Sequence, residues 1–217
     1  MSLTDLGVTG AGGFGREVPD VIEALNLANG GTYSVVGMVD PNPSLVNLDR
    51  LAGRGVPYLG GEDAWLAAGG QAHFVVGIED PTTRQCVGKH LQQAGLLAAA
   101  IVHPGATIGG LSTLGDGTVV RAGVQVSMNA TVRNHVHPNS NATIGHDATL
   151  GDFVSVNPAA IGSDEVVILS GVLLGAGSVV LEGLSIGARS VVGASACVTQ
   201  NVPESATVVG VPDRTTS

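Results

Sequence analysis

The sequence predicts a small parallel α/β domain followed by a solenoid of six-residue repeats. Three observations favour this fold class: an aliphatic residue recurs at almost every sixth position from Val102 onward, a glycine-rich turn lies near the start, and aromatic residues make up only 3% of the 217 residues. A period of six matches neither the 3.6 of a helix nor the 2 of a flat sheet. The period therefore corresponds to the length of one side of a coil that turns a corner every six residues.

The repeat also predicts which side chains point into the coil. Of the seventeen multiples of six from 102 to 198, fifteen are Val, Ile or Leu, and the exceptions are Pro138 and Gly162. The residue two before each is mostly small, so both positions face inward along an extended side. Three sides give a coil of eighteen residues, and the residues two and three after each multiple of six form an outward corner. His146 and Asp147 fall at such a corner, in one column with Asp164.

Before about residue 100 short apolar runs alternate with stretches of helical pattern. We expect strands at 6–9, 34–39, 72–78 and 96–102, and helices at 16–28, 62–68 and 81–94. Strands that alternate with helices favour a small parallel sheet with helices on its faces. We therefore place the boundary between the two domains at residue 100, giving domains of residues 1–100 and 101–217.

The glycine-rich turn lies between the first expected strand and the first expected helix. Its spacing, Gly10-x-Gly12-x-x-Gly15, presents bare backbone amides and a helix N-terminus to a phosphate. Asp40 ends the next strand, where it could accept hydrogen bonds from a ribose or base. The sheet lacks the second half of a dinucleotide fold, so a Rossmann-like domain for a single nucleotide is expected. A tight turn that needs small residues is the alternative.

Composition excludes several classes of function. The formal charge of −9 and the absence of a Lys/Arg cluster disfavour a nucleic-acid partner. No apolar run approaches the roughly 20 residues of a membrane span, so none is expected. Cys86 and Cys197 have no metal-ligand spacing and are expected to be buried thiols in a reducing compartment. We accordingly expect a cytoplasmic protein.

Over essentially its whole length the sequence resembles the bacterial nucleotide-sugar N-acetyltransferases of the PglD/NeuD type. The resemblance rests on the stretch from Ile144 to Phe153, on the GAGGFG turn, and on the ending Val209-Gly210-Val211-Pro212. It implies a left-handed parallel β-helix that forms a homotrimer and binds acetyl-CoA between adjacent subunits. It further implies that the N-terminal domain holds the nucleotide of a nucleotide-linked amino sugar.

The resemblance also implies roles for individual residues. His146 would be the general base and Asp147 would orient it and favour its protonated form, without a covalent acyl-enzyme. This suits the chemistry, because an amine that attacks a thioester must lose a proton and imidazole accepts one near neutral pH. The implied binding residues are Gly12, Gly13, Phe14, Asp40 and Pro41 for the nucleotide, Asn139 for the sugar, and Ser155, Ala176 and Ala194 for acetyl-CoA.

Three positions depart from the family pattern. Related enzymes often have His where Phe14 and Ser155 stand, and a second acid where Pro41 stands. The first and third departures affect contacts with the nucleotide. The second removes a donor that would polarise the acetyl carbonyl or hold CoA.

Three other functions are compatible with parts of the sequence. A sugar O-acetyltransferase of the same fold would use the same base, and a non-catalytic protein that binds nucleotide sugars would keep the coil without the chemistry. A metal-dependent carbonic anhydrase also uses this coil, but it requires three His ligands from adjacent subunits. The spacing of His103, His135, His137 and His146 does not supply them, so no metal is expected.

Overall fold

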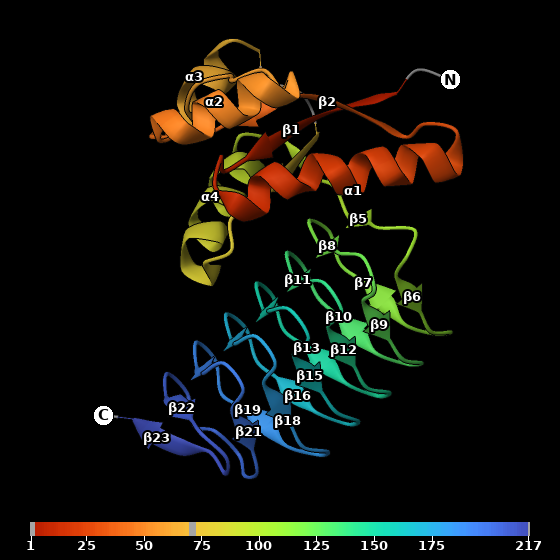
Figure 1. Ribbon diagram of the computed structural model, residues 1–217, viewed down its shortest axis with the longest axis vertical. Coiled ribbons are helices and arrows are strands. Elements are labelled where there is room, and N and C mark those ends of the chain that lie inside the picture. Colours follow the sequence, from red (N-terminus) through yellow and green to blue (C-terminus); the bar gives the residue numbers. More distant parts are fainter. Residues whose placement is uncertain (1–2, 70–72, 217) are drawn as a thin grey trace. The chain divides into compact units, whose positions relative to one another are not determined.

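The computed structural model describes residues 3–69 and 73–216, and these form two compact units that meet in sequence between Ile101 and Val102. Figure 1 shows the first unit as helices around a small sheet and the second as stacked coils in sequence order. An α/β region followed by a left-handed parallel β-helix is the predicted fold class, which is thereby confirmed.

The first unit contains a four-stranded parallel sheet in the order β2-β1-β3-β4. Its strands are β1 Thr4–Thr9, β2 Tyr33–Val39, β3 His73–Val76 and β4 Leu97–Ala98, and its helices are α1 Gly13–Asn29, α2 Leu45–Arg54, α3 Glu62–Ala67 and α4 Pro81–Gln93. The predicted small parallel sheet is confirmed. Helix α2 was not predicted, because only one of its residues, Leu51, is buried and its apolar stripe is short.

Glycine makes the turn from β1 into α1 possible. A Cβ on Gly15 would lie 1.8 Å from the carbonyl oxygen of Gly10, so the helix can approach the strand only where a side chain is absent. Helix α4 begins with Asp80 as its N-cap, which accepts a hydrogen bond of 2.7 Å from the Thr83 N–H, and with Pro81 in the first turn. The glycine turn before α1 and the N-terminal part of α4 form two edges of the cavity described below.

Two predictions for the first unit are wrong in detail. Residues 96–102 do not form one strand: β4 pairs with β3, whereas β5 Ile101–Val102 pairs with β8 Val119–Val120 of the second unit's first coils. Cys86 is exposed rather than buried, because it lies off the stripe of α4 that packs inward at Arg84, Gly88 and Leu91. Cys197 is only partly buried, and both cysteines are free. Residue 72 of the predicted strand 72–78 lies outside the described residues.

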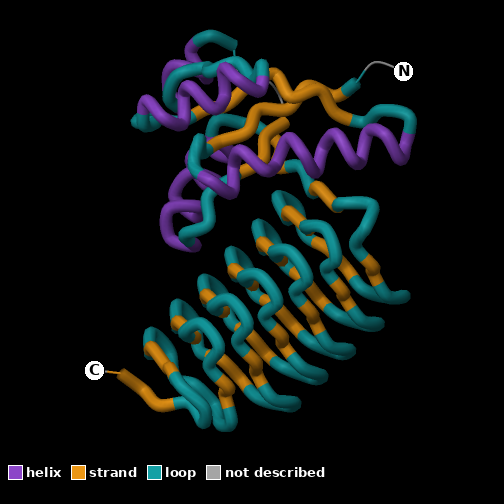
Figure 2. Tube along the Cα trace, viewed as in Figure 1, coloured by secondary structure: helices purple, strands orange, loops and turns teal. Residues whose placement is uncertain are grey.

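The second unit is a prism with three faces, and Figure 2 shows its short strands joined by turns. Most strands pair in parallel with the strand eighteen residues later, as Thr131 does with Thr149. At the C-terminal end, Val191 of β20 pairs with Thr207 of β22, sixteen residues later. The first face holds β6 Thr107–Ile108, β9 Gln125–Val126, β12 Thr143–Ile144, β15 Ile161–Gly162, β18 Val179–Val180 and β21 Cys197–Val198. The second face holds β7 Thr113–Leu114, β10 Thr131–Val132, β13 Thr149–Leu150, β16 Val167–Ile168 and β19 Ser185–Ile186. The third holds β11 His137–Pro138, β14 Ser155–Val156, β17 Leu173–Leu174, β20 Val191–Val192 and β22 Thr207–Val209, closed by the antiparallel β23 Arg214–Thr216.

The core of the prism is narrow and built from Val, Ile, Leu and Ala. Leu150, Leu174 and Val192, all at multiples of six, have no exposed surface. Ala142 and Ala148, each two residues before such a position, are equally buried. The predicted alternation of large and small inward side chains is confirmed, and it fills a section too thin for aromatic rings.

From residue 111 to residue 195, each corner of the prism contains a residue in the left-handed backbone region. The residue three after each multiple of six has a positive φ from Leu111 to Ser195, and for Asp147 the angle is 59°. This conformation turns the chain from one face of the prism to the next. It leaves the Asp147 side chain exposed, whereas the side chains of His135 and Phe153 are buried and stack on each other.

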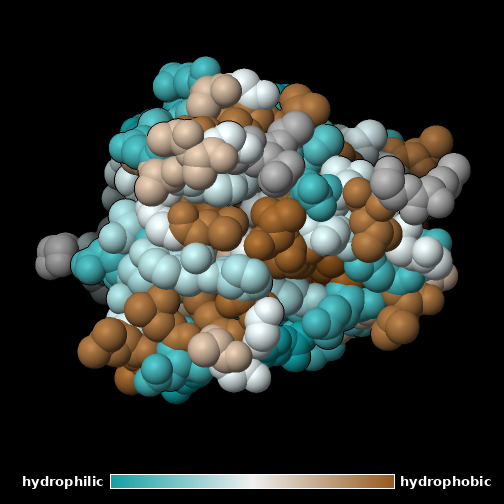
Figure 3. Space-filling model, turned by 90° about the horizontal axis from the view of Figure 1, so that it is seen from above, coloured by the Kyte–Doolittle hydropathy of each residue, from teal (hydrophilic) through white to brown (hydrophobic). Residues whose placement is uncertain are grey.

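Some large apolar side chains are exposed on the surface. Leu27 and Leu45 are 87% and 79% exposed, and on the face seen in Figure 3 hydrophobic and hydrophilic residues are interspersed. Among residues 3–69 and 73–216, no helix has the length and apolar character to cross a membrane.

We expect Leu150→Ala to lower the free energy of unfolding by about 2–5 kcal/mol, because it leaves a cavity in the narrow core. Leu111→Ala is the matched control, since Leu111 is 81% exposed and lies in the same β-helix. Its effect should stay within about 0.5 kcal/mol. Urea denaturation followed by circular dichroism measures both, and equal losses for the two variants would contradict the predicted register.

Candidate active site

His146 and Asp147 lie at the corner between β12 and β13, and their side chains are 46% and 44% exposed. The predicted outward corner is therefore confirmed. The His146 Nδ1 lies 2.7 Å from Asp147 Oδ2. A carboxylate only accepts hydrogen bonds, so Nδ1 carries the proton and donates it to Asp147. The other ring nitrogen, Nε2, is left as the atom that can exchange a proton with a ligand.

Asp147 is held in place from the coil before. The Asn129 side-chain amide, eighteen residues earlier, donates a hydrogen bond to Asp147 Oδ1. This hydrogen bond and the one from His146 lower the pKa of Asp147 below its ordinary value. The carboxylate therefore stays ionised beside the imidazole.

Asp164 approaches the imidazole from the coil after. Its Oδ1 accepts a hydrogen bond of 3.0 Å from the backbone N–H of His146, and its Oδ2 lies 3.3 Å from His146 Nε2. The sequence predicted that Asp164 lies in one column with His146 but predicted no function for it. The spacing of eighteen residues was the signal that could have identified it.

The pKa of His146 is raised above its ordinary value. The main cause is the hydrogen bond to Asp147, and the negative charges of Asp164, Asp147 and Glu165 add to it, while partial burial opposes them. The surroundings therefore favour the imidazolium form more than water favours it in a free histidine.

The remaining β-helix residues that the family resemblance singles out do not lie at this corner. Asn139, Ala176 and Ala194 follow strands of the third face and precede strands of the first, so they share a different corner. Ser155 is buried in β14, where it pairs with His137 of β11. Within one chain, the structure does not bring these residues to His146.

The five residues predicted to bind a nucleotide do lie together. A cavity of about 470 Å³ in the first unit is lined by Gly10, Gly12, Gly13, Phe14, Asp40, Pro41, Glu62, Gly77, Ile78, Glu79, Thr83 and Val87. The two carboxylate oxygens of Asp40 accept backbone hydrogen bonds from Ala11 at 2.8 Å and Asn42 at 2.9 Å. Asp40 thus fixes the glycine turn as well as lining the cavity.

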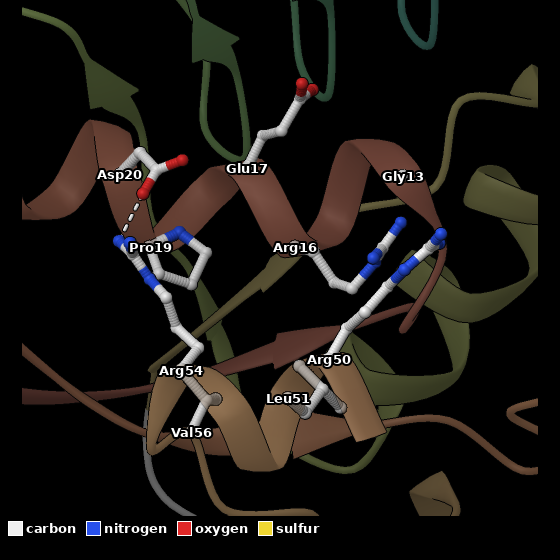
Figure 4. A pocket seen from close by; sticks show the side chains of 9 residues that line it. All are labelled: Gly13, Arg16, Glu17, Pro19, Asp20, Arg50, Leu51, Arg54 and Val56. Carbon is white, nitrogen blue, oxygen red and sulfur yellow. Dashed lines mark hydrogen bonds and ion pairs between the residues drawn. The ribbon is translucent and has the colours of Figure 1, made fainter. Parts of the chain in front are cut away.

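A second cavity, of about 360 Å³, lies between α1 and α2 and shares Gly13 with the first. Figure 4 shows Arg16 and Arg50 extending side by side toward Gly13, with Glu17 pointing away. Arg54, in contrast, is bound to Asp20 and to Glu23. Sequence reasoning missed Arg16 and Arg50, since α1 and α2 are distant in the chain and α2 was not predicted.

Metal ligands do not cluster in the part of the chain that the structure describes. No group of three or more His, Cys, Asp and Glu side chains there could hold a metal ion.

Comparison with known proteins agrees with these features. The family model of the PglD N-terminal domain matches residues 5–91. The GDP-perosamine N-acetyltransferase of Escherichia coli O157:H7 is 30% identical over 176 residues, which cover 79% of this chain and 76% of the relative.

The solved structures that resemble this chain over nearly its whole length include PerB and the acetyltransferase domain of PglB. PerB from Caulobacter crescentus, in complex with CoA and GDP-perosamine, is 28% identical with a TM-score of 0.87, covering 100% of this chain and 99% of PerB. The acetyltransferase domain of PglB from Neisseria gonorrhoeae, in complex with acetyl coenzyme A, is 25% identical with a TM-score of 0.86, covering 99% of this chain and 100% of that domain. The chain therefore belongs to the nucleotide-sugar N-acetyltransferases of the PglD/NeuD type, a family of acetyl-CoA-dependent enzymes.

Proposed function

We propose that this protein transfers the acetyl group of acetyl-CoA to the amino group of a GDP-linked amino sugar, with His146 as the general base. The hydrogen bond of 2.7 Å between His146 Nδ1 and Asp147 carries the proposal. It fixes the tautomer and the orientation of the ring, so that Nε2 is directed to the ligand side. The amine forms the new C–N bond, the C–S bond breaks, and the imidazolium returns a proton to the departing sulfur.

Transfer is direct, because neither cysteine is placed to carry the acetyl group. Cys86 belongs to α4 of the first unit. Cys197 lies on the first face in β21, three strands from the β12 strand that leads to His146. At about 4.8 Å per strand, three strands span about 14 Å. A thiol at that distance cannot exchange an acetyl group with an amine beside His146.

We place the nucleotide base in the larger cavity of the first unit. Three carboxylates, those of Asp40, Glu62 and Glu79, line it, and no Lys or Arg does. Such a lining suits the edge of a base that is rich in N–H donors and opposes a diphosphate. Guanine presents both a ring N–H and an amino group along one edge, whereas uracil presents a single N–H. The likeness to enzymes named for GDP-perosamine supports the same choice.

We place the diphosphate toward Arg16 and Arg50. The Nε of Arg16 donates a hydrogen bond of 3.2 Å to the Gly12 carbonyl oxygen, which leaves the two terminal nitrogens of the guanidinium available. Arg50 has no ion pair with any described residue. Guanidinium groups bind phosphate oxygens through paired N–H donors. Because Gly13 borders both cavities, a base in one and a diphosphate at the other fit a single nucleotide.

In the same proposal, acetyl-CoA binds along the corner between the third and first faces, where Ala176 and Ala194 lie. Both alanines are exposed, and a Cβ on the adjacent Gly175 would lie 2.5 Å from the Ala194 nitrogen. Small side chains there leave backbone groups open to a pantetheine arm. Since this corner and that of His146 are different edges of one prism, a site that uses both needs two copies of the chain. A homotrimer with sites between subunits meets that need.

Transfer to a sugar hydroxyl is the second candidate, because the same base serves it. A purely binding role is disfavoured by the intact hydrogen-bonded pair of His146 and Asp147.

We expect His146→Ala to lower kcat by about two to four orders of magnitude, the scale of a general base. Release of the CoA thiol with GDP-perosamine as acceptor measures it. His90→Ala is the matched control, because His90 is exposed and paired with Asp63 in the first unit. Turnover of His146→Ala equal to that of the unaltered enzyme would contradict the mechanism.

We expect Arg50→Ala to raise KM for the nucleotide sugar by roughly ten-fold, the effect of losing a hydrogen bond between charged groups. The KM for acetyl-CoA should stay unchanged. Arg54→Ala is the matched control, since Arg54 lines the same cavity but is already neutralised by Asp20 and Glu23. Equal changes in both variants would show that the diphosphate does not bind at Arg50.

A further inference from the structure

Asp164 differs from Asp152, an acidic residue at another corner of the β-helix. At the corner between the second and third faces, Asp152 accepts the backbone N–H of Asn134 at 3.0 Å, eighteen residues earlier. Asp164 makes the same bond to the N–H of His146 through Oδ1, also at 3.0 Å. That bond joins successive coils and is structural. The second oxygen of Asp164 is different, because it faces the Nε2 of the imidazole at 3.3 Å.

The imidazole thus has a carboxylate at each nitrogen. Asp147 accepts a hydrogen bond from Nδ1, and Asp164 Oδ2 lies next to Nε2, the nitrogen that a ligand would contact. With both nitrogens protonated the arrangement is satisfied, but the ring cannot then accept a proton. When the ring is neutral, its Nε2 lone pair faces the Asp164 carboxylate, and neither atom can donate a hydrogen bond to the other. A ligand that supplies donors to both atoms resolves this conflict.

An ammonium group supplies them and a hydroxyl does not. A protonated amine has three N–H donors and a positive charge, so it can donate to Nε2 and to Asp164 Oδ2 together. A hydroxyl has one proton and no charge, so one of the two acceptors stays without a partner. A site that leaves an acceptor without a partner discriminates strongly against that ligand. Asp147, Asp164 and Glu165 are the acids whose charges act on His146.

We propose that Asp164 binds the acceptor as an ammonium ion beside His146 Nε2 and thereby selects an amine over a hydroxyl. This inference rests on the proposed function, because it takes His146 as the base. The ammonium loses two protons as it becomes an amide. His146 transfers one to the CoA sulfur as the C–S bond breaks, and the other is released to water at this corner, where Asp164 is 41% exposed.

The first test compares binding of two ligands to the full-length enzyme. GDP-perosamine supplies the amine, and GDP-6-deoxymannose carries a hydroxyl in its place. We expect calorimetry to show that the unaltered enzyme prefers the amine by about ten- to hundred-fold, the effect of a hydrogen bond between charged groups. In Asp164→Asn the ratio of the two Kd values should fall toward one. Asparagine keeps an acceptor oxygen for the His146 N–H, so the coil is preserved.

The second test follows the pH dependence of kcat/KM, whose acid limb reports the base of the free enzyme. Removing the Asp164 charge lowers the pKa of His146, so the neutral base persists to lower pH. We therefore expect the acid limb of Asp164→Asn to move to lower pH. Asp164→Glu should restore part of the amine preference.

Asp152→Asn is the matched control, because it removes a carboxylate that joins two coils at a different corner from that of His146. An unchanged Kd ratio and an unchanged acid limb in Asp164→Asn would overturn the proposal. So would the same changes in Asp152→Asn. His146→Ala separates this inference from the proposed function: if that variant keeps full turnover, the base is wrong, whatever Asp164→Asn does.

Discussion

The β-helix depends on a backbone conformation that L-residues avoid. At each corner from residue 111 to 195, the residue three after the inward position has a φ between 55° and 73°. For residues other than glycine this conformation costs roughly 1–2 kcal/mol. The stacking of coils offsets it, because the N–H of the corner residue donates to the coil before, as Asp147 does to Met128 at 3.2 Å. A corner is therefore stable only within a stack.

The same stacking determines which groups can meet at the candidate base. A side chain at a corner points away from the core, so its neighbours are the next residue in the chain and the equivalent residues one coil away. For His146 these are Asp147, which contacts one ring nitrogen, and Asp164, which contacts the other. A globular fold would surround a base with several elements. Here the next residue in the chain supplies one partner, and the register of eighteen residues supplies the other.

Sequence predicted the β-helix well because its signal is periodic and local. The inward row, the outward corner of His146 and the glycine turn at Gly15 all follow from spacing alone. The N-terminal helix α2 and the Arg16 and Arg50 pair could not be predicted in this way, since a short apolar stripe and a contact between distant segments leave no pattern. The exposure of Cys86 was missed because cysteine type says little about helix orientation.

Local charge, rather than net charge, governs the proposed binding of anionic substrates. The chain carries nine Lys and Arg against eighteen Asp and Glu, so its overall field repels a nucleotide diphosphate. In the first unit, Arg84 is fully buried and donates to the carbonyls of Ile78 and Glu79, and Arg54 is neutralised. Arg16 and Arg50 therefore supply the positive charge beside Gly13, while the cavity across that glycine is lined by carboxylates. An acidic protein can thus orient an anion, because the two ends of one nucleotide meet opposite charges.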